Sequence, residues 1–404
     1  MSTLKQTVHT LARQLRDTLI QDRRHLHAHP ELSFEEHETM RFVAERLQAA
    51  GIEAHAGIAD TGLVAYIKGR NPESRTVALR ADMDALPIVE QNDVPYKSTH
   101  EGVMHACGHD VHTASLLGAA RILNQVKNEF EGTVKLIFQP GEEKFPGGAS
   151  LMIKEGVLQA QHQTPAPHSI VGQHVMPLIP VGKVGFREGM YMASTDEIYL
   201  TVRGKGGHGA MPEMCIDPVL ITAHLITALQ QIISRNSNPK MPSVLSFGKV
   251  IAQGATNVIP NEVHIEGTFR TYDETWRYEA HRRIRQMVEG IAASMGGEAL
   301  LDIKVGYPHL KNHPELTRRA RAAAVGYLGE ENVVDLDLWL AGEDFAYYSQ
   351  QVDACFYRLG TRNEAKGIVS SVHTPTFDID EDALEIGAGL MAWIALEELR
   401  QSQC

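Results

Sequence analysis

The stretch TVKLIFQPGEE, residues 133–143, joins a run of strand-forming side chains to a Pro-Gly turn and a doubled glutamate. Residues 133–138 are mostly β-branched, aromatic or aliphatic, which favours a buried strand. A long helix is expected before this strand, over residues 111–130, and another after it, over residues 149–158. Alternating strands and helices are typical of an α/β sheet, in which residues that follow a strand lie at its carboxyl end.

The same pattern extends outward from this stretch. Residues 62–67, 76–80 and 169–172 are predicted as strands, and residues 4–28 carry apolar side chains at helical spacing. A second helix is expected to begin near Ser33 and to stop at Gly51, because residues 33–36 fit a capping box and glycine commonly ends helices. This order predicts an α/β domain with a mostly parallel sheet and helices on both faces.

The pattern changes near Gly189. The predicted strands are then residues 197–202, 243–250, 262–271 and 300–306, and the predicted helices are residues 218–235 and 275–295. Strand, helix, two strands, helix and strand in this order are typical of an α+β sandwich that can fold separately. The α/β pattern returns after Pro308, and two domains are the expectation for 404 residues. We therefore expect one domain of residues 1–188 and 309–404, interrupted by a second of residues 189–308.

Composition narrows the possible partners and the compartment. The formal net charge of −12 argues against nucleic acid, whose phosphates need clustered lysine and arginine. The four cysteines are widely spaced without CxxC pairs, which favours a reducing compartment over a disulfide framework. The first residues lack an apolar signal core, and no apolar run approaches the length of a membrane span. We expect a soluble cytoplasmic protein without membrane or nucleic-acid partners.

Several short segments carry the residue types that transition metals prefer. They contain Cys107 and His109, the pair Glu142-Glu143, His174, and His373. The glutamate pair and His174 follow predicted strands, and Cys107 and His109 directly precede a predicted helix whose N-terminal dipole would favour a thiolate. Because ligands bind beyond the carboxyl ends of strands in open α/β sheets, we expect these side chains to converge.

Counting the potential ligands sharpens this hypothesis. One cysteine, three histidines and one glutamate are too many for a single tetrahedral catalytic site with an open position. If Cys107 bridges two metals, each metal receives three protein contacts and both can activate one water, as in two-metal hydrolases. One glutamate of the pair would then be spare and could serve as a general base.

Other interpretations of the same residues remain open. Cys107 with His109 could form a nucleophile and base, which would make a cysteine hydrolase. The Glu142-Glu143 pair could be a solvated loop, and Asp82 and Asp84 could cap a turn. A metal-binding or ligand-carrier protein without turnover is a third possibility. A chelator would abolish the activity of a metal-dependent hydrolase and spare that of a cysteine hydrolase. A substrate screen would distinguish an enzyme from a binding protein without turnover.

Three motifs together resemble those of a known enzyme family. They are RADMDALP at residues 80–87, ACGHD at 106–110 and PGEE at 140–143. The chain resembles the aminoacylase/hippurate hydrolase branch of the co-catalytic metallopeptidases, from HLHAHPE at residues 25–31 to the last helix. The resemblance implies that the metal ligands are Cys107, His109, Glu143, His174 and His373. It also implies that Glu142 is the general base and that Asp82 orients the metal site. Much of the wider superfamily has a ligand histidine where Arg80 stands.

The inserted domain resembles the family's lid and dimerisation module. The resemblance implies that His208, in GGHGAMP at residues 206–212, assists the substrate carbonyl, often from the partner subunit of a dimer. It further implies that Asn257 and Arg270 hold the substrate's carboxylate, a task for which the guanidinium fork is suited. Residues 341–347 also match a family segment, to which we assign no catalytic role.

The resemblance therefore implies a metal-dependent amidohydrolase that releases an amino acid from an N-acyl amino acid or a small dipeptide-like substrate. Two divalent metal ions are expected, with zinc, manganese, cobalt and nickel all suited to a mixed Cys/His/Glu site. A homodimer through the inserted domain is expected, and a higher oligomer stays open. The acyl group and the amino acid remain open as well, with hippurate, acetyl-amino acids, acetyl-diaminopimelate and indole-acyl conjugates as candidates.

Overall fold

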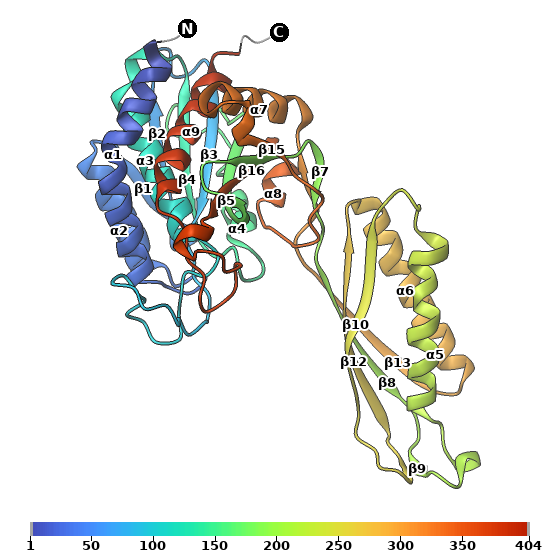
Figure 1. Cartoon of the computed structure of the whole chain (residues 1–404). Helices are drawn as coiled ribbons and strands as arrows, with labels where there is room; N and C mark the ends of the chain where they lie inside the picture. The colour runs from blue at the N-terminus through green and yellow to red at the C-terminus, as the bar shows by residue number, and fades with distance from the viewer. Residues whose placement is uncertain (1–2, 402–404) are drawn as a thin grey trace. The chain divides into compact units, whose positions relative to one another are not determined.

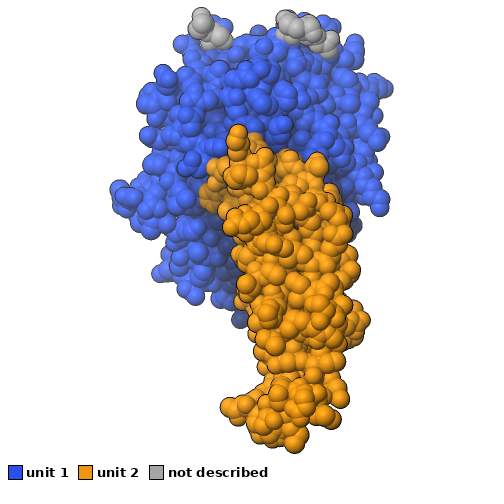
Figure 2. All heavy atoms as spheres, turned by 90° about the vertical axis from the view of Figure 1, so that its right-hand side faces the viewer, with its two compact units in different colours: residues 1–189, 311–337, 344–404 blue, residues 190–310, 338–343 orange. Residues whose placement is uncertain are grey.

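The computed structural model describes residues 3–401, which form two compact units. Within the described chain, unit 1 comprises residues 3–189, 311–337 and 344–401, and unit 2 comprises residues 190–310 and 338–343 (Figure 2). The chain thus enters unit 2 after Gly189 and leaves it after Leu310, whereas the sequence pattern put these changes after residues 188 and 308. The return of residues 338–343 to unit 2 was not expected, since so short a segment carries no periodic pattern.

Unit 1 contains an eight-stranded sheet. Its strands, in spatial order, are β1 (Ala54–Ile58), β2 (Gly62–Lys68), β4 (Thr133–Gln139), β3 (Thr76–Asp82), β5 (Ser169–Pro180), β16 (Asp353–Arg362), β6 (Val184–Phe186) and β15 (Val333–Asp335). The central strands β4, β3, β5 and β16 pair in parallel, and β1, β2 and β6 add antiparallel pairings. The predicted α/β class with a mostly parallel sheet is therefore confirmed.

Helices cover both faces of this sheet (Figure 1). They are α1 (Thr3–Ala28), α2 (His37–Ala49), α3 (His109–Gln125), α4 (Gly148–Lys154), α7 (Pro314–Leu328), α8 (Ala346–Ser349) and α9 (Asp382–Leu399). Helices α3 and α9 pack against β3 and share one apolar core with Val77 and Leu79. Because side chains alternate along a strand, Arg80 and Asp82 lie on the other face, which α4 and α8 cover.

The beginning of α2 corrects the sequence-based expectation. The helix begins at His37 and not near Ser33; its N-cap residue Glu36 makes no capping bond, and the Glu31 carboxylate accepts from the backbone N of Glu38 and of Thr39. The Ser33 hydroxyl instead donates to Asp84 Oδ2 at 2.6 Å, and Phe34 adopts a positive φ of 68°. Glu36 accepts hydrogen bonds from Gly141 N at 2.8 Å and from a threonine hydroxyl. The polar residues that resemble a capping box therefore bind other loops.

Unit 2 is an antiparallel sheet with two helices on one face. The sheet order is β10 (Ser243–Ala252), β12 (Glu262–Thr271), β8 (Asp196–Arg203) and β13 (Glu298–Val305), and the helices are α5 (Pro218–Gln231) and α6 (Glu274–Ser294). The chain order β8, α5, β10, β12, α6, β13 is the α+β order expected from the sequence. Beyond one end of the sheet, β9 (Gly207–His208) pairs with β11 (Val258–Ile259).

The connections between the units, the apolar character of the helices and the state of the cysteines bear on the sequence-based expectations. The short strands β7 (Gly189–Met192) and β14 (Leu310–Asn312) contain the two main unit boundaries. Among residues 3–401, none of the helices combines the length and the apolar character that crossing a membrane requires. Cys107, Cys215 and Cys355 are unpaired, and Cys404 lies outside the described residues.

Candidate metal centre

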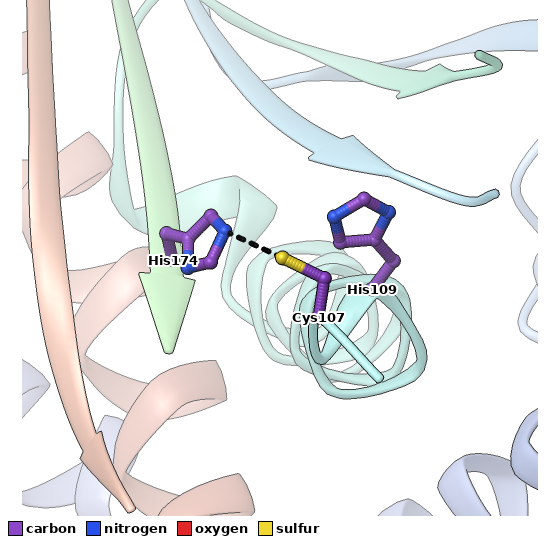
Figure 3. A group of neighbouring side chains, drawn as sticks. All are labelled: Cys107, His109 and His174. Carbon is purple, nitrogen blue, oxygen red and sulfur yellow. Dashed lines mark hydrogen bonds between the residues drawn. The ribbon is translucent and has the colours of Figure 1, made fainter. Parts of the chain in front are cut away.

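The five residues predicted as metal ligands come from separate segments of unit 1. Cys107 lies just before α3, His109 begins that helix, Glu143 lies in the turn after β4, His174 belongs to β5, and His373 lies in the loop before α9. Figure 3 shows Cys107, His109 and His174, with the sulfur of Cys107 between the two rings. The carboxyl ends of parallel strands meet at one edge of a sheet, which explains how distant segments converge.

Cys107 lies at the centre of this group. Its Sγ is 3.4 Å from Nε2 of His174 and 3.3 Å from Nε2 of His373. The donor atoms of Cys107, His109 and His174 all lie within 4.8 Å of one another, and so do those of Cys107, Glu143 and His373. Cys107 thus belongs to both triads, as required of a thiolate that two metals share.

Hydrogen bonds orient two of the histidines for metal binding. Nδ1 of His174 donates to the carbonyl of Val175 at 2.7 Å, and Nδ1 of His109 lies 3.1 Å from Oδ1 of Asp84. Both contacts leave Nε2 as the ligand atom. Nε2 of His109 is buried and has no hydrogen-bond partner among residues 3–401. A buried imidazole nitrogen without a partner, beside a thiol and a second imidazole, fits a bound cation.

Backbone conformation brings these donors together. Gly108 has a positive φ of 83°, and a Cβ at this position would lie 2.5 Å from a methyl group of Val175. Only glycine therefore fits between Cys107 and His109. His373 also has a positive φ, of 61°, and its backbone N donates to the carbonyl of Ala106 at 2.7 Å. This bond holds the loop before α9 against the loop before α3.

Buried carboxylates surround the histidines. Burial alone would raise the pKa of Asp82, but Arg80, His109 and His112 hold this pKa well below its usual value. Burial alone would lower the pKa of His109, but Asp82 and Asp84 raise it well above the usual value. The Asp82 and Asp84 carboxylates are therefore ionised, and they favour positive charge at the centre.

The electrostatics of Cys107 argue against a cysteine nucleophile. Burial and the nearby carboxylate of Glu143 raise the pKa of the Cys107 thiol, against the helix-dipole expectation. A nucleophilic cysteine needs a lowered pKa. The contacts of His373 with the Cys107 sulfur and with Glu143 raise the pKa of its imidazole to about 10. A proton thus neutralises this cluster in the absence of a cation, and a metal would displace it.

Glu142 lies beside the ligand triads and is 7% exposed. Carboxylate oxygens of Glu142 and Glu143 lie within 4.8 Å of each other and of a His109 nitrogen. The backbone N of Asp344 donates to Oε1 of Glu142 at 3.3 Å. Adjacent glutamates in the turn after β4 thus lie close enough for one to bind a metal while the other reaches a nearby water.

The predicted substrate-binding residues lie in unit 2, at two different ends of its sheet. His208 is exposed on β9, opposite Val258, and the carbonyl of Asn257 accepts a hydrogen bond from Gly209 N at 2.8 Å. Arg270 lies eight residues along β12 from Glu262, the end nearest His208. At about 3.4 Å per residue this separates Arg270 from that end by ~27 Å. The structure brings His208 and Asn257 together, but Arg270 lies apart from both.

Sequence reasoning missed several residues at the centre. Asp84 binds His109 and also accepts from Glu143 N at 2.9 Å, whereas Asp82 lies 3.8 Å from His109 and binds Nδ1 of His112 at 2.5 Å. Asp84 was noted only as a turn cap, although its spacing of two from Asp82 puts both on one side of the chain. Asp344 lies in residues 341–347, which were matched to a family segment without a catalytic role, and no residue spacing singles it out.

Comparison with known proteins extends these observations. The sequence profile of Peptidase family M20/M25/M40 matches residues 78–397. A Geobacillus stearothermophilus protein named N-acyl-L-amino acid amidohydrolase is 42% identical over 311 residues, covering 77% of this chain and 82% of its own length. The Thermostable carboxypeptidase 2 of Saccharolobus solfataricus is 38% identical over 390 residues, covering 95% and 96%.

A solved structure agrees with the fold, and its description names a dinuclear metal-binding peptidase. The YXEP protein of Bacillus subtilis, described as a dinuclear metal binding peptidase from the M20 family, superposes with a TM-score of 0.81 at 36% identity. The match covers 96% of this chain and 99% of that protein. The profile match, the close relatives and the common fold have one explanation: the chain belongs to peptidase family M20/M25/M40 and is a hydrolase of that family.

Proposed function

We propose that this protein is a metal-dependent amidohydrolase that releases an amino acid from an N-acyl-L-amino acid or a small dipeptide-like substrate. The observation that carries the proposal is the position of Cys107 in two triads of metal-binding side chains, with Glu142 directly beside them. The names of the relatives, an N-acyl-L-amino acid amidohydrolase and a carboxypeptidase, support this substrate class.

The two overlapping triads would hold two divalent cations, in agreement with the dinuclear description of the B. subtilis relative. The ligands would be Cys107, His109, Glu143, His174 and His373. Zinc, manganese, cobalt and nickel all suit this donor set. When bound, such cations polarise an amide carbonyl and lower the pKa of water toward roughly 7. Because Cys107 must stay a thiolate to bind metal, we infer a reducing, cytoplasmic location.

Glu142 would act as the general base. It takes a proton from the water whose oxygen forms a bond to the acyl carbon, and it returns that proton to the nitrogen as the C–N bond breaks. The hydrogen bond from Asp344 N fixes one carboxylate oxygen of Glu142. Asp82 would act indirectly, through its contacts with Arg80 and His112.

Unit 2 would bind the substrate, and a homodimer would complete the site. Arg270 can pair with a substrate carboxylate, and His208 can donate to the carbonyl oxygen, but the two lie at opposite ends of the unit 2 sheet. A second copy could supply His208 and Asn257 to the site that uses Arg270. Strand β10 lies at the edge of its sheet and exposes Val250 and Ile251, as expected of a surface that pairs with another copy.

The direct test combines metal control with a substrate panel. The purified protein is depleted of metal, reloaded with each candidate ion, and assayed on benzoyl-, acetyl- and indole-acyl amino acids by detection of the released amine. We expect turnover to vanish without metal and to return on reloading. The Glu142→Gln variant should keep its metal and lose ~10²–10⁴ in kcat. Chelator-resistant turnover or near-normal activity in this variant would contradict the proposal.

The role of Arg270 has its own test. Arg270→Ala should raise KM for N-acyl amino acids by ~10-fold or more, because it removes a charge-assisted hydrogen bond. The same variant should leave KM unchanged for N-acyl amino amides, which lack the carboxylate. An equal effect on both substrates would mean that Arg270 acts on structure and not on the carboxylate.

A further inference from the structure

A buried polar cluster lies on the face of the unit 1 sheet that α4 and α8 cover. Arg80, Gln139 and Asp344 are all fully buried. Arg80 Nη2 donates to Asp344 Oδ1 at 2.8 Å, and Gln139 Nε2 lies 2.9 Å from both Asp344 oxygens. The backbone N of Ala149, in the first turn of α4, donates to Asp344 Oδ2 at 2.9 Å. One carboxylate thus connects β3, the end of β4 and the beginning of α4.

The same residue also contacts Glu142. The backbone N of Asp344 donates to Glu142 Oε1 at 3.3 Å, and Glu142 follows Gln139 by three residues. The Asp344 carboxylate therefore binds the strand end that carries Glu142, and the Asp344 backbone binds the Glu142 carboxylate. Asp344 is also the first residue of unit 1 after the segment 338–343 of unit 2. The position of its peptide group depends on how firmly this side chain is held.

Stability alone does not account for this arrangement. A buried ion pair is weak support for a stabilising role, since hydrophobic residues of similar volume often serve as well. A helix beginning can be capped by any serine, threonine, asparagine or aspartate. Neither role requires the Asp344 N–H to point at Glu142. A base held by a fixed donor loses less by reorientation during the reaction, and a displacement of about 1 Å can cost ~10²-fold in rate.

We propose that Asp344 is a positioning residue for Glu142: its carboxylate, held by Arg80, Gln139 and Ala149, fixes the peptide N–H that orients the Glu142 carboxylate. This inference rests on the proposed role of Glu142 as the general base. It predicts that Asp344 affects the rate only through Glu142, and leaves metal content and substrate affinity unchanged.

The test is a double-mutant cycle in the full-length, metal-loaded protein. Asp344→Asn keeps the size of the side chain and removes its charge. In the wild-type background we expect kcat to fall ~10–100-fold, with KM and bound metal within about twofold. In the Glu142→Asp background, where the shorter carboxylate already lies away from residue 344, the same substitution should lower kcat less than ~3-fold.

Two further variants separate positioning from general damage. Glu398→Gln is the matched control, because Glu398 is a buried carboxylate bound by Arg319 at 2.8 Å on α9, outside the centre. It should lower the unfolding temperature without changing kcat. Gln139→Met removes one donor to Asp344 and leaves the ion pair with Arg80, so it should reduce kcat in the same manner, by a smaller factor. This second variant also serves if Asp344→Asn does not fold.

Crystals of metal-free wild type and Asp344→Asn give a readout independent of activity. We expect the Glu142 carboxylate to have left the backbone N of residue 344 in the variant. An unmoved Glu142, or an equal fall in kcat in both backgrounds, would overturn the inference. Absence of amidase activity in the metal-loaded wild type would instead overturn the proposed function, and the position of Glu142 would still decide whether Asp344 fixes it.

Discussion

The two units hold their candidate functional residues in opposite ways. In unit 1, Cys107 is 7% and His109 1% exposed, and hydrogen bonds orient His109 and His174; the His373 side chain, at 51% exposure, is the exception. In unit 2, His208 and Asn257 are exposed, and strand pairing and turn contacts of the backbone hold them. The contrast follows from topology. Side chains at the carboxyl ends of parallel strands lie together at one buried edge of the sheet, whereas the tip of an antiparallel sheet is open to solvent.

This difference separates chemistry from recognition. Metal-binding side chains need positions fixed to within about 0.5 Å, which a packed core with supporting hydrogen bonds can supply. Exposed residues at the end of a sheet can instead contact the substrate or a second subunit once the substrate has bound, as residues on mobile elements do in many enzymes. Substitutions of the proposed ligands and of the residues that orient them in unit 1 should therefore alter metal content, and those at the tip of unit 2 should alter turnover alone.

The largest effect is expected at Cys107. Cys107→Ala removes the one donor common to both triads, so both metal positions lose a ligand. We expect metal affinity to fall by more than the ~10–100-fold typical for loss of an outer partner, and turnover to vanish with it. We would measure the metal content of the variant by elemental analysis and its activity at saturating metal. Cys355→Ala, at a buried cysteine outside both triads, is the control. If Cys107→Ala still bound its full metal content and were active, the proposal that two metals share the Cys107 thiolate would be wrong.

His208 should show the opposite behaviour. His208→Ala is expected to lower kcat by ~10²–10³, as for loss of an oxyanion donor, with metal content and unit 1 stability unchanged. If His208 acts across a dimer, a mixture of the His208→Ala and Glu142→Gln proteins should recover roughly a quarter of wild-type activity. After subunit exchange half of the dimers contain one chain of each variant, and each such dimer has one intact site. Mixtures that stay inactive after subunit exchange would show that His208 acts within its own chain.

Asp84 offers a smaller test within unit 1. Asp84→Asn weakens the orientation of His109 and the bond to Glu143 N, so metal affinity should fall ~10–100-fold while substrate KM at saturating metal stays constant. Ser33→Ala, which removes only the hydroxyl donor to Asp84, should cause a smaller loss of the same kind. Unaltered metal affinity in Asp84→Asn would indicate that Asp82 alone orients the centre.

Most of the predicted ligands carry local signals in the sequence. Cys107, His109 and Glu143 lie beside a strand or helix end that periodicity reveals, and topology brings such ends together, whereas His174 lies within β5 and His373 in the loop before α9. The four strands and two helices of unit 2 were likewise predicted in their correct order, since alternating and helical patterns are strong there. Family resemblance, and not spacing, separated Glu142 from Glu143.

The remaining features depend on contacts that sequence patterns do not contain. Ser33 was predicted to cap a helix because the capping pattern considers only neighbouring residues. Its hydroxyl instead donates a hydrogen bond to Asp84, which is 51 residues away in the sequence. Asp344 binds Arg80 across 264 residues. The distance between His208 and Arg270 follows from strand register in unit 2, which residue identity alone does not fix.

The smallest effect concerns the stability of unit 2 against acid. Burial would raise the pKa of Asp196, but His281 at 2.7 Å and Arg277 at 2.5 Å hold this pKa below its usual value. A depressed carboxyl pKa stabilises the fold above the unfolded value near 3.9 and loses this contribution as pH falls through the folded pKa. Asp196→Asn should therefore unfold at a lower temperature than wild type at pH 7, by roughly 3–5 °C per kcal/mol lost.

The pH dependence of the difference in unfolding temperature between wild type and Asp196→Asn shows whether the charge of Asp196 is responsible. It should shrink below about pH 4, because protonation then removes the same charge from wild type. Asp302→Asn on β13 is the control, since Asp302 is 59% exposed and its pair with Lys304 contributes at most ~1 kcal/mol. If the difference in unfolding temperature between Asp196→Asn and wild type stayed constant from pH 7 to pH 3, the substitution would act through packing and not through charge. The buried ion pair of unit 2 would then be distinct from the carboxylates of unit 1, where charge holds the metal-binding histidines in place.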